Sequence, residues 1–174
     1  MSARVDQAAR ELLASLGIYQ PPVPVEELAM RLGVNIVRDA LGQGVSGVLY
    51  RQDKGQSVIA VNASHAVVRQ RFSIAHEIGH LRLHAGRPII VDHLVRGRVN
   101  MRDERSSLAT SREEIEANGF AAALLMPAEW ISTDVNGSLG GAPGRTVESL
   151  AERYNVSEQA MEFRLVNLGY RSAP

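Results

Sequence analysis

The chain has 174 residues, which suits one domain with at most a small appendage. Its apolar fraction of 45% and charged fraction of 22% are ordinary for a soluble globular protein, and its formal net charge of zero gives no overall field for nucleic acid or anionic membranes. The absence of cysteine excludes disulfides, thiolate metal sites and a cysteine nucleophile. No membrane span or signal-peptide core is visible, so we expect a cytoplasmic protein without membrane partners.

The first third of the chain predicts two helices and a small sheet. Apolar residues at helical spacing predict helices over 4–16 and 25–32. β-type runs separated by turn residues follow at 34–38, 45–50 and 57–61. We expect an α+β fold in which a small, mainly antiparallel sheet packs against the next helix.

That next helix carries the motif His-Glu-x-x-His, formed by His76, Glu77 and His80. Residues four apart lie on one face of a helix, so the two histidines can bind one metal ion together. Glu77 lies about 100° around the helix from His76, beside the metal, where it can take a proton from the attacking water. This spacing is a zinc-hydrolase signature and predicts a Zn²⁺ site.

The flanks of the motif favour one helix over residues 67–83, which contain no proline. Ile74, Ile78 and Leu81 form an apolar stripe suited to a core, and the two histidines lie off this stripe. We therefore expect the helix to bury one face and to present its histidines from another. The alternative is a pair of surface histidines on an amphipathic helix with no metal.

Residues 86–112 predict a mobile surface loop, with a short strand as an alternative over 88–91. The segment mixes several arginines with acidic residues and serines. A solvated loop is favoured over a lid or a docking site for an acidic partner, because exposed charge is usual at protein surfaces.

A second helix is predicted over 111–126, with Ser111 as N-cap and Pro127 after its end. On a helical wheel Glu114 lies inside an apolar arc, where a carboxylate is costly unless a partner offsets its desolvation. A zinc ion would be that partner, since catalytic zinc commonly takes two His and one Glu. Glu116 lies outside the arc, and Glu114 could instead cap its helix or pair with an arginine. The arc consists of Ala117, Ala121, Leu125, Ala122, Ile115 and Met126.

The C-terminal region predicts a flexible linker followed by two helices with helix-turn-helix spacing. The second helix carries Glu158 and Glu162 and lacks the basic face that DNA requires, so packing or partner docking is favoured and direct nucleic-acid binding is not. The predicted division is a metallopeptidase domain over 1–135, a linker over 136–144 and a helical segment over 145–174.

Two sequence blocks together resemble the ImmA/IrrE metallopeptidases. The first is Arg71-Phe72-Ser73-Ile74-Ala75-His76-Glu77-Ile78-Gly79-His80, which looks like the active-site helix of that family, and the second runs from Glu114 to Pro127. The resemblance implies a gluzincin-like fold and a cytoplasmic protease of the short type that cleaves a helix-turn-helix transcriptional repressor, inducing mobile-element or stress genes.

Carried over by residue, the resemblance makes His76 and His80 metal ligands and Glu77 the catalytic base. It implies a glutamate of the second block as third ligand, with an Asp or similar residue four positions later orienting a ligand histidine. Glu114 and Asn118 have that spacing, and Glu116 is the fallback.

Three further residues are weighed for supporting roles. His84 comes too early for a third histidine ligand and is interpreted as support for the site, while Tyr50 or His93 could stabilise an oxyanion. The sequence thus predicts a zinc endopeptidase. Two alternatives stay open: an antirepressor that acts by docking with little proteolysis, and a DNA-binding regulator that uses the C-terminal helices.

Overall fold

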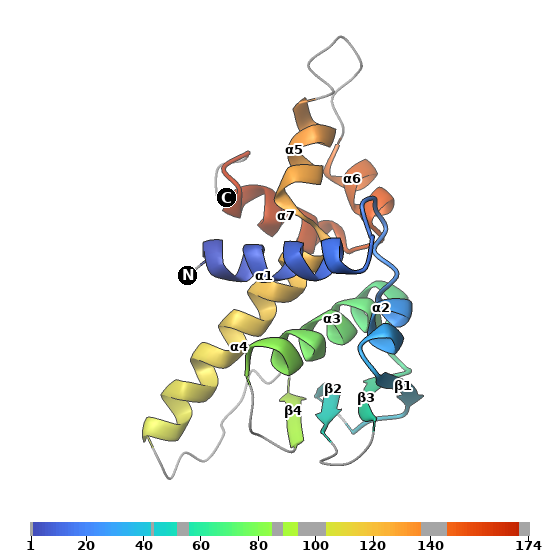
Figure 1. Cartoon of the computed structure of the whole chain (residues 1–174), viewed down its shortest axis with the longest axis vertical. Helices are drawn as coiled ribbons and strands as arrows, with labels where there is room; N and C mark the ends of the chain where they lie inside the picture. The colour runs from blue at the N-terminus through green and yellow to red at the C-terminus, as the bar shows by residue number, and fades with distance from the viewer. Residues whose placement is uncertain are drawn as a thin grey trace. The chain divides into compact units, whose positions relative to one another are not determined.

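The structure is a computed structural model (Figure 1). It describes residues 2–42, 44–51, 56–84, 89–93, 104–136 and 146–170, and the side chains of residues 2, 89–93 and 104–111 are not described. In chain order the elements are α1 (Ser2–Ser15), α2 (Val25–Arg31), β1 (Val34–Asp39), β2 (Val45–Tyr50), β3 (Ser57–Asn62), α3 (Val67–Leu83), β4 (Ile89–His93), α4 (Glu104–Leu125), α5 (Ala128–Asn136), α6 (Val147–Tyr154) and α7 (Glu158–Asn167).

The chain divides into two compact units. The helical unit consists of Met1–Val23 and Ala122–Pro174, and the sheet unit consists of Pro24–Ala121. The three-part division predicted from sequence stays a prediction, and its linker lies outside the described residues from position 137 onwards. None of the helices in the described ranges combines the length and apolar character that a membrane span needs.

The sheet unit is built on four strands in the order β1-β3-β2-β4. β1 pairs with β3 in parallel, with Ile36 opposite Ile59, whereas β2 pairs antiparallel with both β3 and β4. Two of the three pairings are therefore antiparallel, which confirms the mainly antiparallel sheet expected from sequence. The parallel pairing places β1 at one edge of the sheet, away from its neighbour in sequence.

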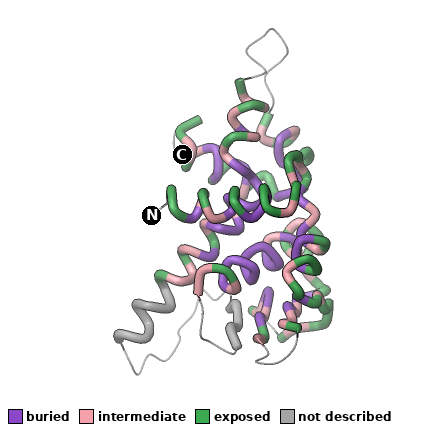
Figure 2. The backbone as a smooth tube through the Cα atoms, in the orientation of Figure 1, coloured by how far each residue is buried: buried purple, intermediate pink, exposed green. Residues whose placement is uncertain are grey.

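α3 packs on β2 and β3 and is the most enclosed helix of this unit (Figures 1 and 2). Leu49 and Ile59 of the sheet and Ile74 and Ile78 of α3 are all 0% exposed and form the core beneath the helix. All residues from Ser73 to His80 are buried, because α4 covers the face that the sheet leaves free. The histidines therefore lie on another face than the apolar stripe, as expected, and α4 covers that face.

The helical unit has an apolar core and fixes its charged residues by internal contacts. Val5, Ala9, Leu12 and Leu13 of α1 are buried at helical spacing. α6 and α7 begin at the hydroxyl caps Thr146 and Ser157, which accept hydrogen bonds from backbone N–H groups inside each helix, and together form the helical pair expected from sequence.

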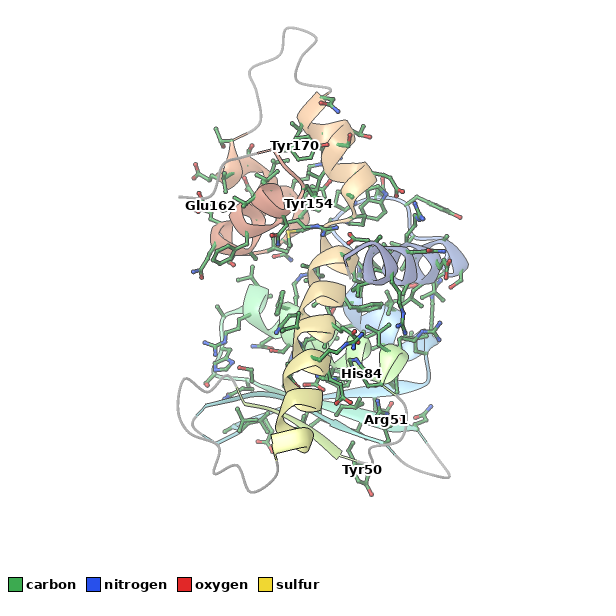
Figure 3. The ribbon with its side chains drawn as sticks, turned by 90° about the vertical axis from the view of Figure 1, so that its left-hand side faces the viewer. Tyr50, Arg51, His84, Tyr154, Glu162 and Tyr170 are labelled. Carbon is green, nitrogen blue, oxygen red and sulfur yellow. The ribbon has the colours of Figure 1, made fainter. Side chains whose placement is uncertain are left out.

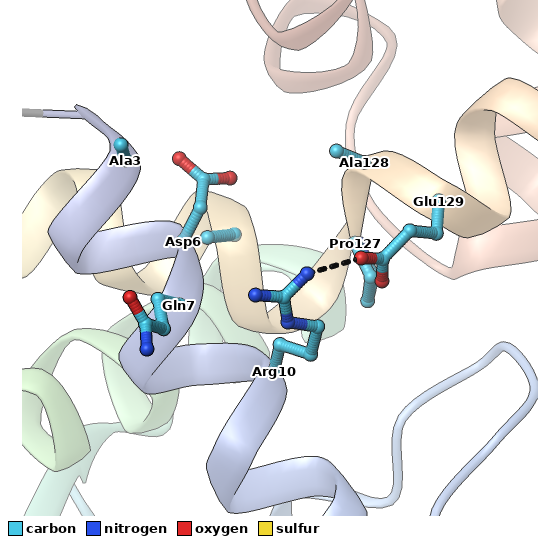
Figure 4. Close-up of a pocket in the computed structure, with 8 residues that line it drawn as sticks. Ala3, Asp6, Gln7, Arg10, Pro127, Ala128 and Glu129 are labelled. Carbon is cyan, nitrogen blue, oxygen red and sulfur yellow. Dashed lines mark hydrogen bonds and ion pairs between the residues drawn. The ribbon is translucent and has the colours of Figure 1, made fainter.

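A cavity of about 240 Å³ lies in the helical unit between α1 and the start of α5 (Figure 4). Arg10 and Glu129 form an ion pair across it, with 2.6 Å between Nη1 and Oε1, and both side chains are more than half exposed. No cluster of potential metal ligands lines this cavity among the described residues. The residues with catalytic chemistry gather elsewhere, in the sheet unit.

The segment between the two motif helices differs most from the sequence prediction. Strand β4 occupies residues 89–93, near the short strand considered over 88–91. α4 begins at Glu104, so Ser111 lies inside the helix and is not its N-cap. Residues 104–118 contain no glycine or proline, and nothing in that stretch stops the helix from extending towards its N-terminus. The remainder of the predicted loop, residues 86–88 and 94–103, lies outside the described residues.

Two smaller differences concern α4 and the segment after it. The helical wheel puts Ile115 in the apolar arc, but this residue is 61% exposed, whereas Ala117, Ala121 and Leu125 of the same arc are buried. After Pro127 the chain forms α5, which was not predicted from the sequence.

Candidate metal centre

Three side chains converge in the sheet unit: His76 and His80 from α3 and Glu114 from α4. The Nε2 atoms of the histidines are 3.0 Å apart, and each lies 3.2 Å from one oxygen of the Glu114 carboxylate. Ligand atoms about 2.0–2.1 Å from a tetrahedral zinc ion lie about 3.3 Å apart. The donor set and its spacing therefore fit a zinc ion held by these three residues.

The approach of α4 to α3 depends on Gly79, which lies between the two histidines in sequence. A Cβ atom at Gly79 would be 3.2 Å from the Cα and carbonyl oxygen of Ala117 and 3.2 Å from the Phe120 ring. Helix backbones can pack this closely only where a side chain is missing. Gly79 thus lets α4 bring Glu114, one turn before Ala117, up to the histidines.

The outward nitrogens of both histidines also have partners. Nδ1 of His76 is 3.0 Å from Oδ1 of Asn118, and Nδ1 of His80 is 3.2 Å from Nδ1 of His84. His84 in turn has its Nε2 3.1 Å from the Glu116 carboxylate. Such contacts fix the orientation of a histidine ring and leave its other nitrogen for a metal.

Glu77, the residue between the ligand candidates, is 0% exposed and lies against β2. A Cβ atom at Gly47 of that strand would come within 2.9 Å of the Glu77 Oε1 atom. A glycine inside a strand often marks such a close approach. The position of the Glu77 carboxylate therefore depends on the missing side chain at Gly47.

Arg51, at the end of β2, ties this strand to the end of α3. Its Nη2 donates to the backbone carbonyl oxygens of His80 and His84, at 2.6 Å each (Figure 3 labels Arg51 and His84). Burial lowers the pKa of Arg51, while the negative charges of Glu77 and Glu113 act to raise it. Its cation suits the helix C-terminus, where backbone carbonyls carry partial negative charge.

Glu114 is the solvent side of the cluster, with a side chain that is 32% exposed against 2% for His76 and 1% for His80. Burial by itself would raise the pKa of Glu114. Hydrogen bonds and charge from His76 and His80 outweigh this effect, and the pKa falls from 4.5 to about 2. The carboxylate is thus held as an anion next to the two imidazoles, which is the form that binds a metal.

The sequence profile of one family, the IrrE N-terminal-like domain of a peptidase family, matches residues 29–166. The chain belongs to the ImmA/IrrE family. It is 32% identical over 167 residues to the radiation response metalloprotease IrrE of Deinococcus deserti, which covers 95% of this chain and 53% of that protein. It is 30% identical over 105 residues to the uncharacterized immunity region protein 2 of Bacillus phage phi105, covering 60% of this chain and 59% of that protein.

The chain therefore spans little more than half the length of these two relatives. Among solved structures, a Mycobacterium tuberculosis transcriptional regulator has the same fold, with a TM-score of 0.61 and 18% identity over 94% of this chain and 46% of that one. At this identity the likeness concerns the fold alone.

The structure brings together the ImmA/IrrE residues that the sequence selected. Glu114 reaches the histidines, and Asn118, four residues later, contacts His76. Glu116, the fallback for the third ligand, contacts His84 instead. Tyr50, one of the two oxyanion candidates, is 44% exposed and points outward (Figure 3), and the side chain of the other, His93, lies outside the described residues.

Sequence reasoning missed three residues that shape this ImmA/IrrE site: Gly47, Arg51 and Gly79. The two glycines carry a signal, since each interrupts a regular element where glycine is otherwise unfavourable. Arg51 carried none, because it stands beside a polar turn and resembles any surface arginine in the sequence.

Proposed function

We propose that this ImmA/IrrE protein is a zinc-dependent endopeptidase of the gluzincin type, which cleaves a helix-turn-helix transcriptional repressor and so relieves repression. The observation that carries the proposal is the convergence of His76, His80 and Glu114 next to Glu77. Two buried imidazoles beside a partly exposed carboxylate form a donor set that a metal ion would stabilise, and peptide hydrolysis is the chemistry of the family.

His76, His80 and Glu114 would hold the zinc ion by two nitrogens and one oxygen, a donor set common in catalytic zinc sites. When bound, zinc lowers the pKa of water towards 7 and polarises the carbonyl group of the scissile peptide. Since the chain would supply three ligands, a zinc ion held here would keep room for a water or substrate ligand.

Glu77 is the general base. Its carboxylate takes a proton from the attacking water as the water oxygen bonds to the carbonyl carbon. The same carboxyl group then gives this proton to the amide nitrogen as the C–N bond breaks, which releases an amine and a carboxylic acid. The acid then ionises by losing the second proton of the water. Gly47 supports this role because it lets the Glu77 carboxylate lie against β2.

The repressor substrate is proposed from regulatory context. One relative is named for a phage immunity region and the other for a radiation response, and we take both names as regulatory contexts. A repressor with a flexible, cleavable segment between its domains would be a suitable substrate for a protease in the cytoplasm.

The test is cleavage of the helix-turn-helix repressor encoded nearest to this protein's gene. Zinc-loaded wild type and Glu129→Gln, a carboxylate-to-amide control in the helical unit, should both cut it, and a chelator should stop them. Glu77→Gln should keep its zinc but lose cleavage by at least about a hundredfold, the usual contribution of a general base. Equal cleavage by Glu77→Gln would contradict the assignment of the base. Relief of repression by a zinc-loaded protein that leaves the repressor intact would replace proteolysis with docking.

A further inference from the structure

Behind the ligand candidate His80 lies a line of contacts that the proposed reaction does not use. It runs from Nδ1 of His80 to Nδ1 of His84 at 3.2 Å, and from Nε2 of His84 to Oε2 of Glu116 at 3.1 Å. Arg112 completes it, with Nε 3.2 Å from the other oxygen of Glu116. We call His80, His84 and Glu116 the histidine relay.

The histidine relay is buried at His80, and at its other end Glu116 is held by the exposed Arg112. The side chain of His80 is 1% exposed, that of His84 8% and that of Glu116 14%, whereas Arg112 is 67% exposed. His80 and His84 lie one helical turn apart, and Arg51 binds the carbonyl oxygens of both. The geometry is therefore fixed by β2 and α3 together with the glutamate from α4.

Hydrogen-bonding rules give the relay a direction. An ionised carboxylate only accepts hydrogen bonds, so Nε2 of His84 must carry the hydrogen that faces Glu116. Nδ1 of a neutral His84 is then an acceptor, and Nδ1 of His80 must donate to it. For a His80 that holds a metal ion, this leaves Nε2 without a hydrogen, with its lone pair directed into the cluster that it forms with His76 and Glu114.

If the hydrogen of His84 were on Nδ1 instead of Nε2, His80 could not bind a metal ion. A hydrogen on Nδ1 of His84 would require Nδ1 of His80 to be the acceptor, and the hydrogen of a neutral His80 would move to Nε2. That hydrogen would point into the cluster, where Nε2 is 3.2 Å from Glu114, and the ring could not bind a metal there. Only one arrangement of the relay is compatible with a metal ligand at His80.

We infer that His84 is a positioning residue, which together with Glu116 holds His80 in the tautomer and orientation that bind the metal. The inference rests on the proposed metal site. It gives Glu114 and Glu116 of α4 different tasks, since Glu114 faces the Nε2 atoms of His76 and His80 and Glu116 faces His84. Asn118 plays the matching part for His76, so each ligand ring has a partner at its outer nitrogen.

The first test is zinc affinity, measured by competition with a chelator. His84→Leu and Glu116→Ala should weaken zinc binding by about tenfold to a hundredfold, the usual effect of losing a group that orients a ligand. His84→Asn should recover most of the loss, because its amide oxygen can take the place of Nδ1 and accept from His80. Arg82→Ala and Ile115→Ala, exposed neighbours on α3 and α4, should bind zinc like the wild type.

The second test reads the tautomers by ¹⁵N NMR of the histidine rings in the zinc-loaded protein. The wild type should carry its hydrogen on Nδ1 in His80 and on Nε2 in His84, and Glu116→Ala should lose this preference at His84. A purely structural role for His84 would not move these signals. His84 protonated at Nδ1 in the wild type would overturn the inference.

The two proposals fail in different ways. If the wild type binds no zinc at all, the proposed metal site fails, and the inference fails with it. If the wild type binds zinc and His84→Leu, folded by circular dichroism, binds it equally well, the inference alone is overturned.

Discussion

The sheet unit and the helical unit treat buried polar groups differently. Of the eight buried polar or charged residues described, seven lie in the sheet unit and one, Arg164, lies in the helical unit. The seven are Ser46, Asn62, Arg71, Ser73, His76, Glu77 and His80. Burying such groups costs free energy unless they are paired, so their concentration in one unit indicates where function, and not packing alone, has shaped the sequence.

The helical unit uses its charges to hold its own helices together. Arg164 donates from Nε to the backbone oxygen of Met126 at 3.0 Å and forms an ion pair with Asp6. Arg153 and the Tyr154 hydroxyl both donate to Oδ2 of Asp134 at 2.9 Å. These contacts join elements far apart in sequence. These charged residues therefore stabilise the packing of the helical unit, whereas the candidate metal ligands and the candidate base lie in the sheet unit.

The strongest way to break this contrast is to separate α3 from α4 with Gly79→Ala. The added Cβ would meet Ala117 backbone atoms at 3.2 Å, and backbone cannot rotate away. We expect a loss of about 1–3 kcal/mol in unfolding free energy from overpacking. Zinc affinity should fall as well, because Glu114 moves away from the histidines. Urea unfolding and zinc titration would check this. Since alanine is otherwise favoured over glycine in a helix, a more stable variant would contradict the packing argument.

The matched test in the helical unit is Arg164→Met. Loss of its hydrogen bonds should lower the unfolding free energy by about 2 kcal/mol, as for other hydrogen bonds to charged groups. Arg153→Met, whose arginine is 41% exposed, should cost less than about 1 kcal/mol. Both variants should bind zinc as the wild type does at temperatures where they are folded. Weaker zinc binding by folded Arg164→Met would show that the two units are not independent in function.

Gly47→Ala tests the position of the base without touching a ligand. Its Cβ would lie 2.9 Å from Oε1 of Glu77 and 3.3 Å from Cγ, so the carboxylate must shift. We expect peptidase activity to fall about tenfold, which is about 1.4 kcal/mol, with zinc content unchanged. Gly42→Ala, where no atom lies within 4 Å of the added Cβ, serves as control. Unchanged kcat in Gly47→Ala would mean that Glu77 does not need this position.

The smallest expected effect concerns acid stability of the metal-free protein. The pKa of Glu114 is lowered in the folded protein from 4.5 to about 2. A lowered folded-state pKa contributes stability that is complete above pH 4.5 and is lost as the pH falls towards 2. Urea midpoints in chelator should therefore drop more steeply across this range for the wild type than for Glu114→Gln. Equal slopes would show that Glu114 is not stabilised as an anion by the histidines.

The sequence predicted the features that lie within single elements. The spacing of His76 and His80 fixes their common face on α3, and the helical wheel put Glu114 on the buried side of α4. The wheel failed for Ile115 because it gives the angle of a side chain but not which element covers it. The charged composition of residues 86–112 concealed the start of α4 at Glu104, where helix propensity alone is a weak guide.

Contacts between elements were not accessible from sequence. The parallel pairing of β1 with β3, the contact of Arg51 with the end of α3 and the closeness that Gly79 allows all depend on tertiary packing. A supporting role was predicted for His84, yet its partner Glu116 could be identified only once α3 and α4 were placed side by side.

The central claim is that His76, His80 and Glu114 hold one metal ion. The most direct measurement is the zinc content of the purified wild type, Glu114→Ala and Glu116→Ala after saturation with zinc and removal of the excess. We predict about one zinc per chain in the wild type and in Glu116→Ala, and none in Glu114→Ala. Zinc retained by Glu114→Ala and lost by Glu116→Ala, or no zinc in the wild type, would contradict it.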